Sequence, residues 1–176
     1  RKLGAAGVAV IDDSAVFRMD ADVPLLVPEV NAHAAKKMPR GIVAIPNCTT
    51  TPLVMALKPL HDAAGVKRVV VTTFQSVSGT GSAAMEELVE QTKALLSFRD
   101  VEARVYPHQI AFNLLPHIGS FSRDGECSEE VKIVLETQKI LEAPAMRITA
   151  TTVRVPVLRC HSEAINVEFE RPLKPN

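Results

Sequence analysis

The sequence predicts an α/β fold. Short runs of apolar and β-branched residues alternate along the chain with stretches whose apolar residues recur at helical spacing. The 176 residues are enough for one domain with its own core, or for one domain and a piece of another. Because a predicted strand begins almost at the first residue, we expect the chain to be a segment of a longer protein.

Five segments rich in apolar and β-branched residues predict strands. They are Val8–Ile11, Ile42–Ile45, Lys67–Phe74, Met146–Leu158 and Ala164–Phe169. The last two alternate apolar with polar residues, which is typical of strands with one face on a core. The second half of the chain therefore predicts a mixed or antiparallel sheet.

Three longer segments predict helices because their apolar residues recur every three or four positions. They cover residues 49–64, 82–96 and 128–141, and residues 31–38 predict one or two further helical turns. The predicted inner faces are Leu53, Ala56, Leu57, Leu60 and Ala64 in the first helix, and Met85, Leu88, Val89, Thr92 and Leu96 in the second. Residues 97–127, punctuated by proline and glycine, predict a long loop.

The first predicted helix carries boundary residues at both ends. Thr51 followed by Pro52 predicts an N-cap and a first helical position, because proline lacks only an N–H that has no helical acceptor there. Gly65 predicts the end of the helix, since glycine readily adopts the left-handed backbone that follows many helices.

Charge and hydropathy exclude several classes of function. Twenty Lys and Arg balance twenty Asp and Glu, so nothing indicates a nucleic acid or an anionic membrane as partner. No apolar run reaches the ~18 residues of a membrane helix. Cys48, Cys127 and Cys160 are too few and too widely spaced for a disulfide framework or a zinc motif. We therefore expect a reducing compartment, the cytoplasm, and no metal.

Cys48 is the candidate nucleophile. It follows a predicted strand and precedes a predicted helix, within Pro46-Asn47-Cys48-Thr49-Thr50. The unpaired N–H groups and the dipole at a helix start stabilise a thiolate, and they can also hold a developing oxyanion. A small buried hydrophobic residue at a turn fits the same position equally well.

Arg154 and His161 are candidates for the two groups that a thiolate nucleophile usually requires, one that holds the substrate and one that acts as a base. Arg154, on a predicted strand, can grip a carboxylate through two parallel hydrogen bonds. His161 follows shortly after and can act as a general base near neutral pH. A surface arginine and a loop histidine are the plainer interpretation of each residue taken alone.

Gly79-Thr80-Gly81 lies between a predicted strand and a predicted helix. Two glycines there let the backbone approach a phosphate or a nicotinamide, or they simply begin the helix. The full dinucleotide fingerprint, GxGxxG after a strand, is absent.

Seven segments taken in order carry a family resemblance. They are residues 10–20 (VIDDSAVFRMD), Val27–Asn31, Pro46–Thr50, Phe74–Gly81, Ala111–Gly119, Arg154–Val157 and His161–Glu163. Together they resemble aspartate-β-semialdehyde dehydrogenase, over nearly the whole chain and in the family's order. The sequence departs from the family pattern at Cys160, where a small residue is expected before His161, but no catalytic group is lost.

The resemblance implies a glyceraldehyde-3-phosphate-dehydrogenase-like catalytic domain with a mixed or antiparallel sheet, preceded by a remnant of a Rossmann-type domain. Residues 1–47 would be that remnant of the nucleotide-binding domain, and residues 48–176 the catalytic and dimerisation domain. The family's N-terminal glycine-rich segment and C-terminal return have no counterpart in the sequence. The resemblance further implies a homodimer or a dimer of dimers.

The resemblance also implies an activity. It is the reversible, NADP-dependent conversion of L-aspartate-4-semialdehyde and phosphate to 4-phospho-L-aspartate, in the biosynthesis of lysine (through diaminopimelate), methionine and threonine. Cys48 would form a thiohemiacetal with the aldehyde and then a thioester, which phosphate cleaves. Asn47-Cys48-Thr49-Thr50-Thr51 differs from the Ser-Cys-Thr-Thr-Asn type of motif in glyceraldehyde-3-phosphate dehydrogenase.

The resemblance also implies the site residues, because each family position with a known role matches one residue of this sequence. The catalytic positions match Cys48 as nucleophile, His161 as acid/base and Gln75 as the residue that orients the reacting group. The substrate carboxylate and ammonium positions match Arg154 and Glu129. The phosphate-binding positions match Arg18, Asn47 and Lys132, and the cofactor-contacting turn matches Ser78, Gly79 and Gly81.

Three alternatives stay open at this stage. The related N-acetyl-γ-glutamyl-phosphate reductase shares the chemistry, although its cysteine lies in a different, glycine-containing motif. A non-catalytic dimerisation module would result if the missing cofactor lobe is native. A metal site at Cys160 and His161 is disfavoured, because adjacent strand residues do not readily bind one ion together.

Overall fold

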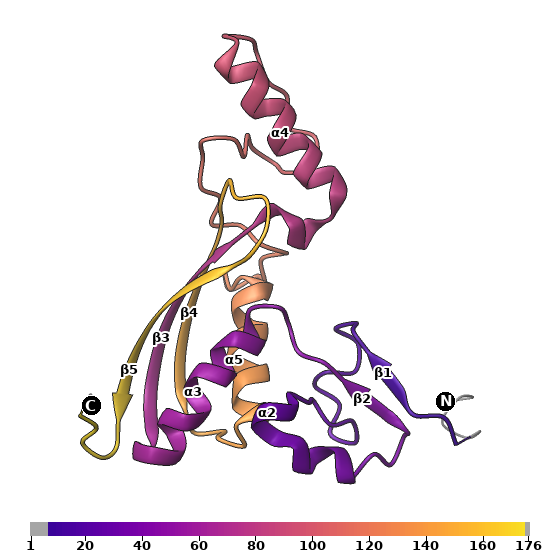
Figure 1. Ribbon diagram of the computed structural model, residues 1–176, viewed down its shortest axis with the longest axis vertical. Coiled ribbons are helices and arrows are strands. Elements are labelled where there is room, and N and C mark those ends of the chain that lie inside the picture. Colours follow the sequence, from indigo (N-terminus) through magenta and orange to yellow (C-terminus); the bar gives the residue numbers. More distant parts are fainter. Residues whose placement is uncertain (1–6, 175–176) are drawn as a thin grey trace. The chain divides into compact units, whose positions relative to one another are not determined.

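The computed structural model describes residues 7–174, so the first six residues of the predicted nucleotide-domain remnant lie outside the described part. Helices and strands alternate along the chain, which confirms the α/β class (Figure 1). The strands are β1 (Val10–Asp12), β2 (Ile42–Ala44), β3 (Val66–Gln75), β4 (Arg147–Arg154) and β5 (Ser162–Phe169). The helices are α2 (Pro28–Asn31), α3 (Thr50–Ala64), α4 (Ser82–Leu96) and α5 (Ser128–Ile140), with 3₁₀ turns η1 (Ala32–Lys36) and η2 (Val77–Thr80).

The strands of the described residues form two sheets. β1 and β2 pair in parallel, with Val10 opposite Ile42 and Asp12 opposite Ala44. The second sheet has the order β4-β3-β5, and its three long strands lie side by side in Figure 1. β3 buries alternate side chains on one face, from Val69 through Thr73 to Gln75. This alternation carries Gln75, at the end of the strand, onto the same buried face as the apolar residues.

The chain divides into two compact units. Within the described residues, the first unit comprises residues 7–70, 131–149 and 166–174, and the second comprises residues 71–130 and 150–165. The first unit has a core from β2, α3, α5 and the extended segment before α2, including Leu25, Leu53, Leu57, Ile133 and Ile140. The second unit has a core of Val77, Ala84, Leu88, Tyr106, Ile110, Ala111 and Leu115.

Most element boundaries differ from the predicted ones by a few residues, and two of the differences have a local cause. α3 begins at Thr50 with Thr49 at the N-cap, so Thr51 is not the cap and Pro52 occupies the third helical position. Proline is accepted there because the first four N–H groups of a helix have no helical acceptor. The predicted strand 146–158 ends at Arg154, because Pro156 has no N–H for a continued ladder.

The predicted inner face of α3 is only partly correct. Leu53, Leu57 and Ala64 are buried, but Ala56 is exposed, and Val54 is buried in addition.

Among residues 7–174, no helix is long and apolar enough to cross a membrane.

The predicted inner face of α4 is only partly correct: Leu88 is buried as predicted, but polar side chains share the buried side of the helix. α4 buries Ala84, Glu87, Leu88 and Gln91, whereas Leu96 is 70% exposed. Glu87 Oε2 accepts hydrogen bonds from the backbone N–H groups of Arg104 and Val105. Gln91 Oε1 accepts from the N–H groups of Ile110 and Ala111, and its Nε2 donates to the carbonyl oxygen of Glu102. α4 therefore anchors the long loop through backbone hydrogen bonds, and part of its apolar stripe faces outward.

Replacing Gln91 by leucine tests this anchoring. Gln91→Leu leaves buried backbone groups of the loop without partners, and we expect the free energy of unfolding of the intact protein to fall by about 3 kcal/mol. Chemical denaturation measures the change. The control is Asp62→Asn, which breaks the exposed ion pair with Lys58 and should cost under about 1 kcal/mol. Equal stability of the two variants would contradict an anchoring role for Gln91.

Candidate active site

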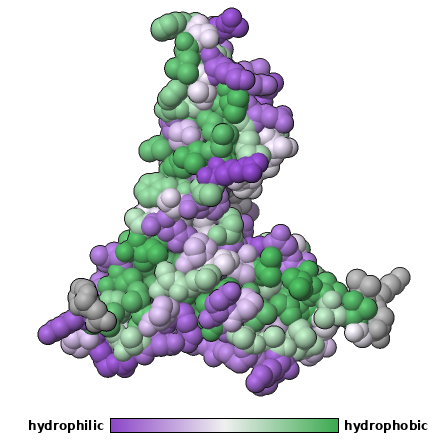
Figure 2. Space-filling model, viewed as in Figure 1, coloured by the Kyte–Doolittle hydropathy of each residue, from purple (hydrophilic) through white to green (hydrophobic). Residues whose placement is uncertain are grey.

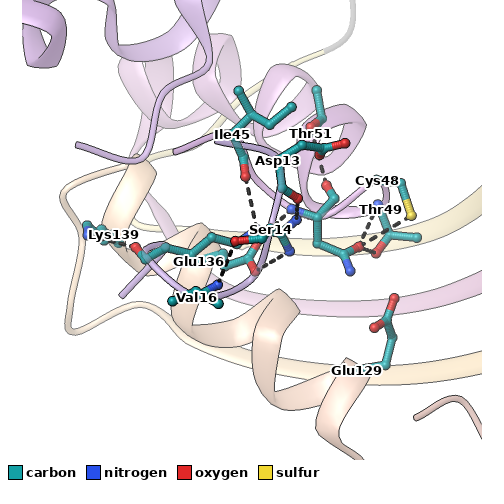
Figure 3. Close-up of polar contacts among 12 residues, drawn as sticks. Asp13, Ser14, Val16, Ile45, Cys48, Thr49, Thr51, Glu129, Glu136 and Lys139 are labelled. Carbon is teal, nitrogen blue, oxygen red and sulfur yellow. Dashed lines mark hydrogen bonds and ion pairs between the residues drawn. The ribbon is translucent and has the colours of Figure 1, made fainter. Parts of the chain in front are cut away.

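Cys48 lies in the turn between β2 and α3, as the sequence predicts. Asn47 organises this turn: its Oδ1 accepts hydrogen bonds from the Thr49 N–H at 2.9 Å and the Thr49 hydroxyl at 2.7 Å. The Cys48 Sγ lies 3.6 Å from the same oxygen, and Figure 3 shows the sulfur turned toward it. The Cys48 residue is exposed, whereas Asn47 and Thr49 on either side are buried. The turn thus presents a thiol at a helix start, where the dipole and N–H groups favour the thiolate.

A buried carboxylate from α5 holds this turn in place. Glu136, 2% exposed, accepts the Asn47 N–H at 2.7 Å and pairs with the Arg18 guanidinium at 3.1 Å (Figure 3). Arg18 also donates from Nε to the Ile45 carbonyl and from Nη2 to the Asp13 carbonyl. All three nitrogens of Arg18 are therefore engaged within the protein. Binding of phosphate by Arg18 stays a prediction, and it would use the remaining N–H groups of the two terminal nitrogens.

α5 carries two lysines near this carboxylate. Lys132 is half-buried and lies four residues before Glu136, hence on the same side of the helix. Lys139 Nζ donates to the carbonyl oxygens of Arg18, Asp20 and Val23 and so fastens the segment that carries Arg18. Burial lowers the pKa of Lys139, although Asp20 and Asp22 act in the opposite direction. α5 thereby positions Arg18, and phosphate binding by Lys132 stays a prediction.

In the second unit, Gln75 and Glu129 form a buried pair. Gln75 Nε2 donates to Glu129 Oε1 at 3.1 Å, and Gln75 Oε1 accepts the Thr73 hydroxyl at 2.9 Å. Because a carboxylate only accepts, the amide nitrogen of Gln75 must be the atom that faces Glu129. Gln75 is 1% exposed and Glu129 is 6% exposed. The orientation of the Gln75 amide is thus fixed from both sides before any ligand binds.

Arg154 presents a buried positive charge. It ends β4 on the buried face, and its Nη1 donates to the Ser76 carbonyl at 2.6 Å. Its Nε is buried and has no hydrogen-bond partner among the described residues. A buried guanidinium with an unsatisfied N–H costs free energy unless an acceptor arrives. A carboxylate is the acceptor that matches its planar geometry.

His161 lies beside Arg154, immediately before β5. The ring nitrogen Nδ1 accepts the backbone N–H of Ser76 at 2.9 Å, with the Ser76 hydroxyl at 3.2 Å. Burial and the positive charge of Arg154 lower the pKa of His161, and Glu129 partly opposes them. The structure therefore favours a neutral imidazole at pH 7.

The predicted cofactor turn lies against these two side chains. A Cβ built on Gly79 would lie 3.4 Å from Arg154 Nη1 and 3.6 Å from His161 Nε2, so the glycine keeps a side chain away from both. Gly81 has φ +102°, which favours glycine, and a Cβ there would meet nothing within 4 Å. Ser78 Oγ lies 3.0 Å from Ser76 Oγ. The main chain of this turn is open to approach.

The predicted residues thus form two groups. The first unit brings together Arg18, Asn47, Cys48 and, on α5, Lys132, and the second brings together Gln75, Glu129, Arg154, His161 and Gly79. Sequence reasoning missed Glu136 and Ser76. An acidic residue on the apolar face of a predicted helix was a signal for Glu136, whereas Ser76 acts through its main chain and left none. Among residues 7–174, no cluster of His, Cys, Asp and Glu could hold a metal ion.

Comparison with known proteins identifies the family. Residues 57–176 match the profile described as "Semialdehyde dehydrogenase, dimerisation domain", and residues 1–38 match "Semialdehyde dehydrogenase, NAD binding domain". The chain belongs to the semialdehyde dehydrogenase family. The predicted boundary at residues 47/48 falls between the two matched regions and stays a prediction.

Semialdehyde dehydrogenases from several organisms are similar to the chain. It is 50% identical to an aspartate-semialdehyde dehydrogenase of Aquifex aeolicus (strain VF5), over 99% of the chain and 52% of that relative. A crystal structure of aspartate semialdehyde dehydrogenase II from Vibrio cholerae, complexed with ASA, has TM-score 0.93 and 47% identity, over 96% of the chain and 51% of that structure. A crystal structure of a Candida albicans aspartate semialdehyde dehydrogenase with NADP has TM-score 0.71 and 28% identity, over 98% of the chain and 47% of that structure.

These similarities confirm the predicted resemblance and the fold class that it implies. The chain spans about half the length of the relatives it matches.

Glu163 lies on β5, close to His161 in the sequence, and the titration of its carboxyl group can be tested. Both carboxylate oxygens are buried and have no hydrogen-bond partner among the described residues. Burial raises the pKa of Glu163 from 4.5 to about 7. The folded state therefore binds this proton more tightly than the unfolded state. The resulting stability is fully present below pH 4.5 and is lost as pH rises through about 7.

We expect Glu163→Gln, which carries no charge at any pH, to remove this loss of stability. The measurement is the free energy of unfolding of the intact protein across that pH range, with the exposed Glu126→Gln as control. If the free energy of unfolding depends on pH in the same way for wild type and Glu163→Gln, the Glu163 carboxyl group does not have the raised pKa.

Proposed function

We propose that the protein carrying this chain is an NADP-dependent, phosphorylating aspartate-semialdehyde dehydrogenase. The observation that carries the proposal is the buried Arg154, whose Nε has no partner among the described residues and which lies beside His161. A buried guanidinium and the buried carboxylate of Glu129 suit the two charges of an α-amino acid. Relatives with the same name support the assignment and its place in amino-acid biosynthesis.

Cys48 carries the covalent step. Its thiolate, stabilised at the start of α3, attacks the aldehyde carbon of L-aspartate-4-semialdehyde and forms a thiohemiacetal. When bound, NADP supplies the hydride acceptor, and a thioester on Cys48 results. Phosphate then attacks the thioester carbon, the Cys48 sulfur leaves, and 4-phospho-L-aspartate is released. The biosynthetic direction is the reverse of this sequence.

The surrounding side chains bind and orient the reactants. Arg154 holds the substrate carboxylate and Glu129 its ammonium, while Gln75, fixed by Thr73 and Glu129, orients the reacting group. Arg18, Asn47 and Lys132 bind phosphate.

The proposed cofactor and compartment rest on two further features. Ser78, Gly79 and Gly81 would hold the nicotinamide cofactor, and the absence of side chains at the two glycines supports this role because it leaves the main chain open to approach. The three cysteines are few and widely spaced in the sequence, which supports the reducing cytoplasm as the compartment.

The activity test uses the intact protein. NADPH should form from aspartate semialdehyde only when phosphate or arsenate is present. Cys48→Ser should lower kcat/KM at least ~10³-fold, because the nucleophile is lost. Cys160→Ser, the matched cysteine control, should stay within a few-fold of wild type. Phosphate-independent turnover, undiminished turnover of Cys48→Ser, or preference for N-acetylated glutamate semialdehyde would each contradict the proposal.

We propose further that the protein is a homodimer and that α4 contributes to the contact between copies. Two adjoining grooves run along α4 and share Val89, Lys93 and Leu158. Figure 2 shows hydrophobic residues interspersed with hydrophilic ones over the part of the surface that α4 occupies in Figure 1. The first groove carries both acidic residues (Glu86, Glu90) and basic residues (Lys93, Arg159). A second copy related by a two-fold axis can pair these opposite charges with each other.

Val89→Glu tests the dimer contact, because it places a charge in the middle of both grooves. Sedimentation velocity of the intact protein should show at least tenfold weaker dimerisation than in wild type. Leu173→Glu, an equally drastic change at another exposed apolar position, should leave the dimer unchanged. An unaltered dimer in Val89→Glu would place the contact elsewhere on the protein.

A further inference from the structure

Tyr106 ties the long loop that follows α4 to the turn η2. Its hydroxyl donates a hydrogen bond to Thr80 Oγ1 at 3.0 Å. The Tyr106 ring is buried in the core of the second unit, and Val77 of η2 belongs to the same cluster. Thr80 is exposed, so the tyrosine reaches from the core to the surface of the turn. Its apolar ring and its polar end thus contact different partners.

Helix α4 holds the loop on both sides of Tyr106. Glu87 Oε2 accepts the backbone N–H groups of the two residues directly before the tyrosine. Gln91 Oε1, one turn farther along α4, accepts those of Ile110 and Ala111. Glu87 and Gln91 are both buried. The position from which the tyrosine hydroxyl meets η2 is therefore set by α4 and not by the loop alone.

The two halves of the turn are held in different ways. In the first half, the N–H groups of Val77 and Ser78 donate to carbonyl oxygens of the segment after β4, at 2.9 and 3.2 Å. In the second half, Thr80 lies between Gly79 and Gly81, and glycines leave the backbone many conformations. The hydroxyl contact with the tyrosine restricts this half. All of these groups belong to the second unit.

We propose that Tyr106 is a positioning residue that holds the main chain of Gly79–Gly81 in the conformation that binds the nicotinamide cofactor. The proposal rests on the function proposed above and adds a residue that acts on the cofactor only through Thr80. Without the tyrosine hydroxyl, cofactor binding has to order the two glycines, and this cost lowers the affinity. Packing of the core requires the ring but not the hydroxyl, so the two roles can be separated.

Tyr106→Phe removes the hydroxyl and keeps the ring. Calorimetric titration of the intact protein with NADP should give a Kd about fivefold above that of wild type, because one neutral hydrogen bond is lost. At saturating NADP, kcat and the KM for aspartate semialdehyde should stay within about twofold of wild type. The matched control is Thr92→Val, which removes a hydroxyl that donates to the Leu88 carbonyl within α4, and it should leave the Kd unchanged. An unchanged Kd in Tyr106→Phe would overturn the proposal.

A double-mutant cycle separates this tether from a direct contact between Thr80 and the cofactor. Thr80→Val keeps the shape of the side chain and removes the other partner of the same hydrogen bond. It should raise the Kd for NADP as much as Tyr106→Phe does, and the double variant should raise it no further. A double variant whose effect equals the product of the two single effects would overturn the proposal, because the two hydroxyls would then act independently.

Hydrogen exchange of the cofactor-free protein tests the turn itself. The Gly81 N–H donates to the Ser78 carbonyl at 3.0 Å, and it should exchange about fivefold faster in Tyr106→Phe than in wild type, with no change in Thr92→Val. Equal exchange in wild type and Tyr106→Phe would overturn the proposal. If the exchange and the calorimetry are as expected but the protein does not oxidise aspartate semialdehyde, the proposed activity fails and the role of Tyr106 stands.

Discussion

The carboxylate of Glu136 is the contact on which the cysteine turn depends. It accepts the Asn47 N–H and pairs with Arg18, with almost no exposure to solvent. Both partners of Glu136 come from segments far away in the sequence, and each would be left with a buried, unsatisfied donor if the carboxylate were absent. The position of Cys48 at the start of α3 therefore rests on a helix that begins eighty residues after it along the chain.

Main-chain hydrogen bonds perform the same task in the second unit. The Ser76 peptide groups fix His161 and Arg154, and Glu129 with Thr73 fixes Gln75. Gln75 and Arg154 are buried, His161 is half-buried, and all three are oriented before a ligand arrives; Arg154 still has an N–H without a partner among the described residues. A preorganised site of this kind stabilises developing charge without reorganising during the reaction. It is also selective, because only a ligand with an acceptor at the right place satisfies Arg154.

Most elements of the fold could be predicted from the sequence, because patterns among neighbouring residues determine them. β-branched runs at residues 67–74 and helical spacing at residues 50–64 express their preferences within a few residues. The inner face of α4 could not be predicted in this way. Its buried Glu87 and Gln91 face a loop whose N–H groups lie 17 to 20 residues farther along the chain. Hydropathy placed Leu96 inside, but the loop needed acceptors rather than apolar surface.

The residues of the candidate site also divide into those that could be predicted from the sequence and those that could not. Cys48 could be predicted because a cysteine between strand and helix has a chemical meaning in the sequence itself. Arg154, His161 and the turn at Gly79–Gly81 were candidates on residue type and position, and the remaining positions came from the family resemblance. Ser76 could not be predicted, because its contribution comes from backbone groups that every residue except proline carries. Glu136 was predictable in principle, as an acidic residue between Ile133 and Ile140 on the buried face of α5.

The central claim is that Cys48 forms a thioester that phosphate cleaves. Mass spectrometry of peptides from the intact protein, after incubation with aspartate semialdehyde and NADP without phosphate, tests it most directly. The account predicts an aspartyl thioester on the peptide containing Cys48, which disappears when phosphate is added. An unmodified Cys48, an adduct on Cys160 instead, or a thioester that phosphate leaves intact would contradict it.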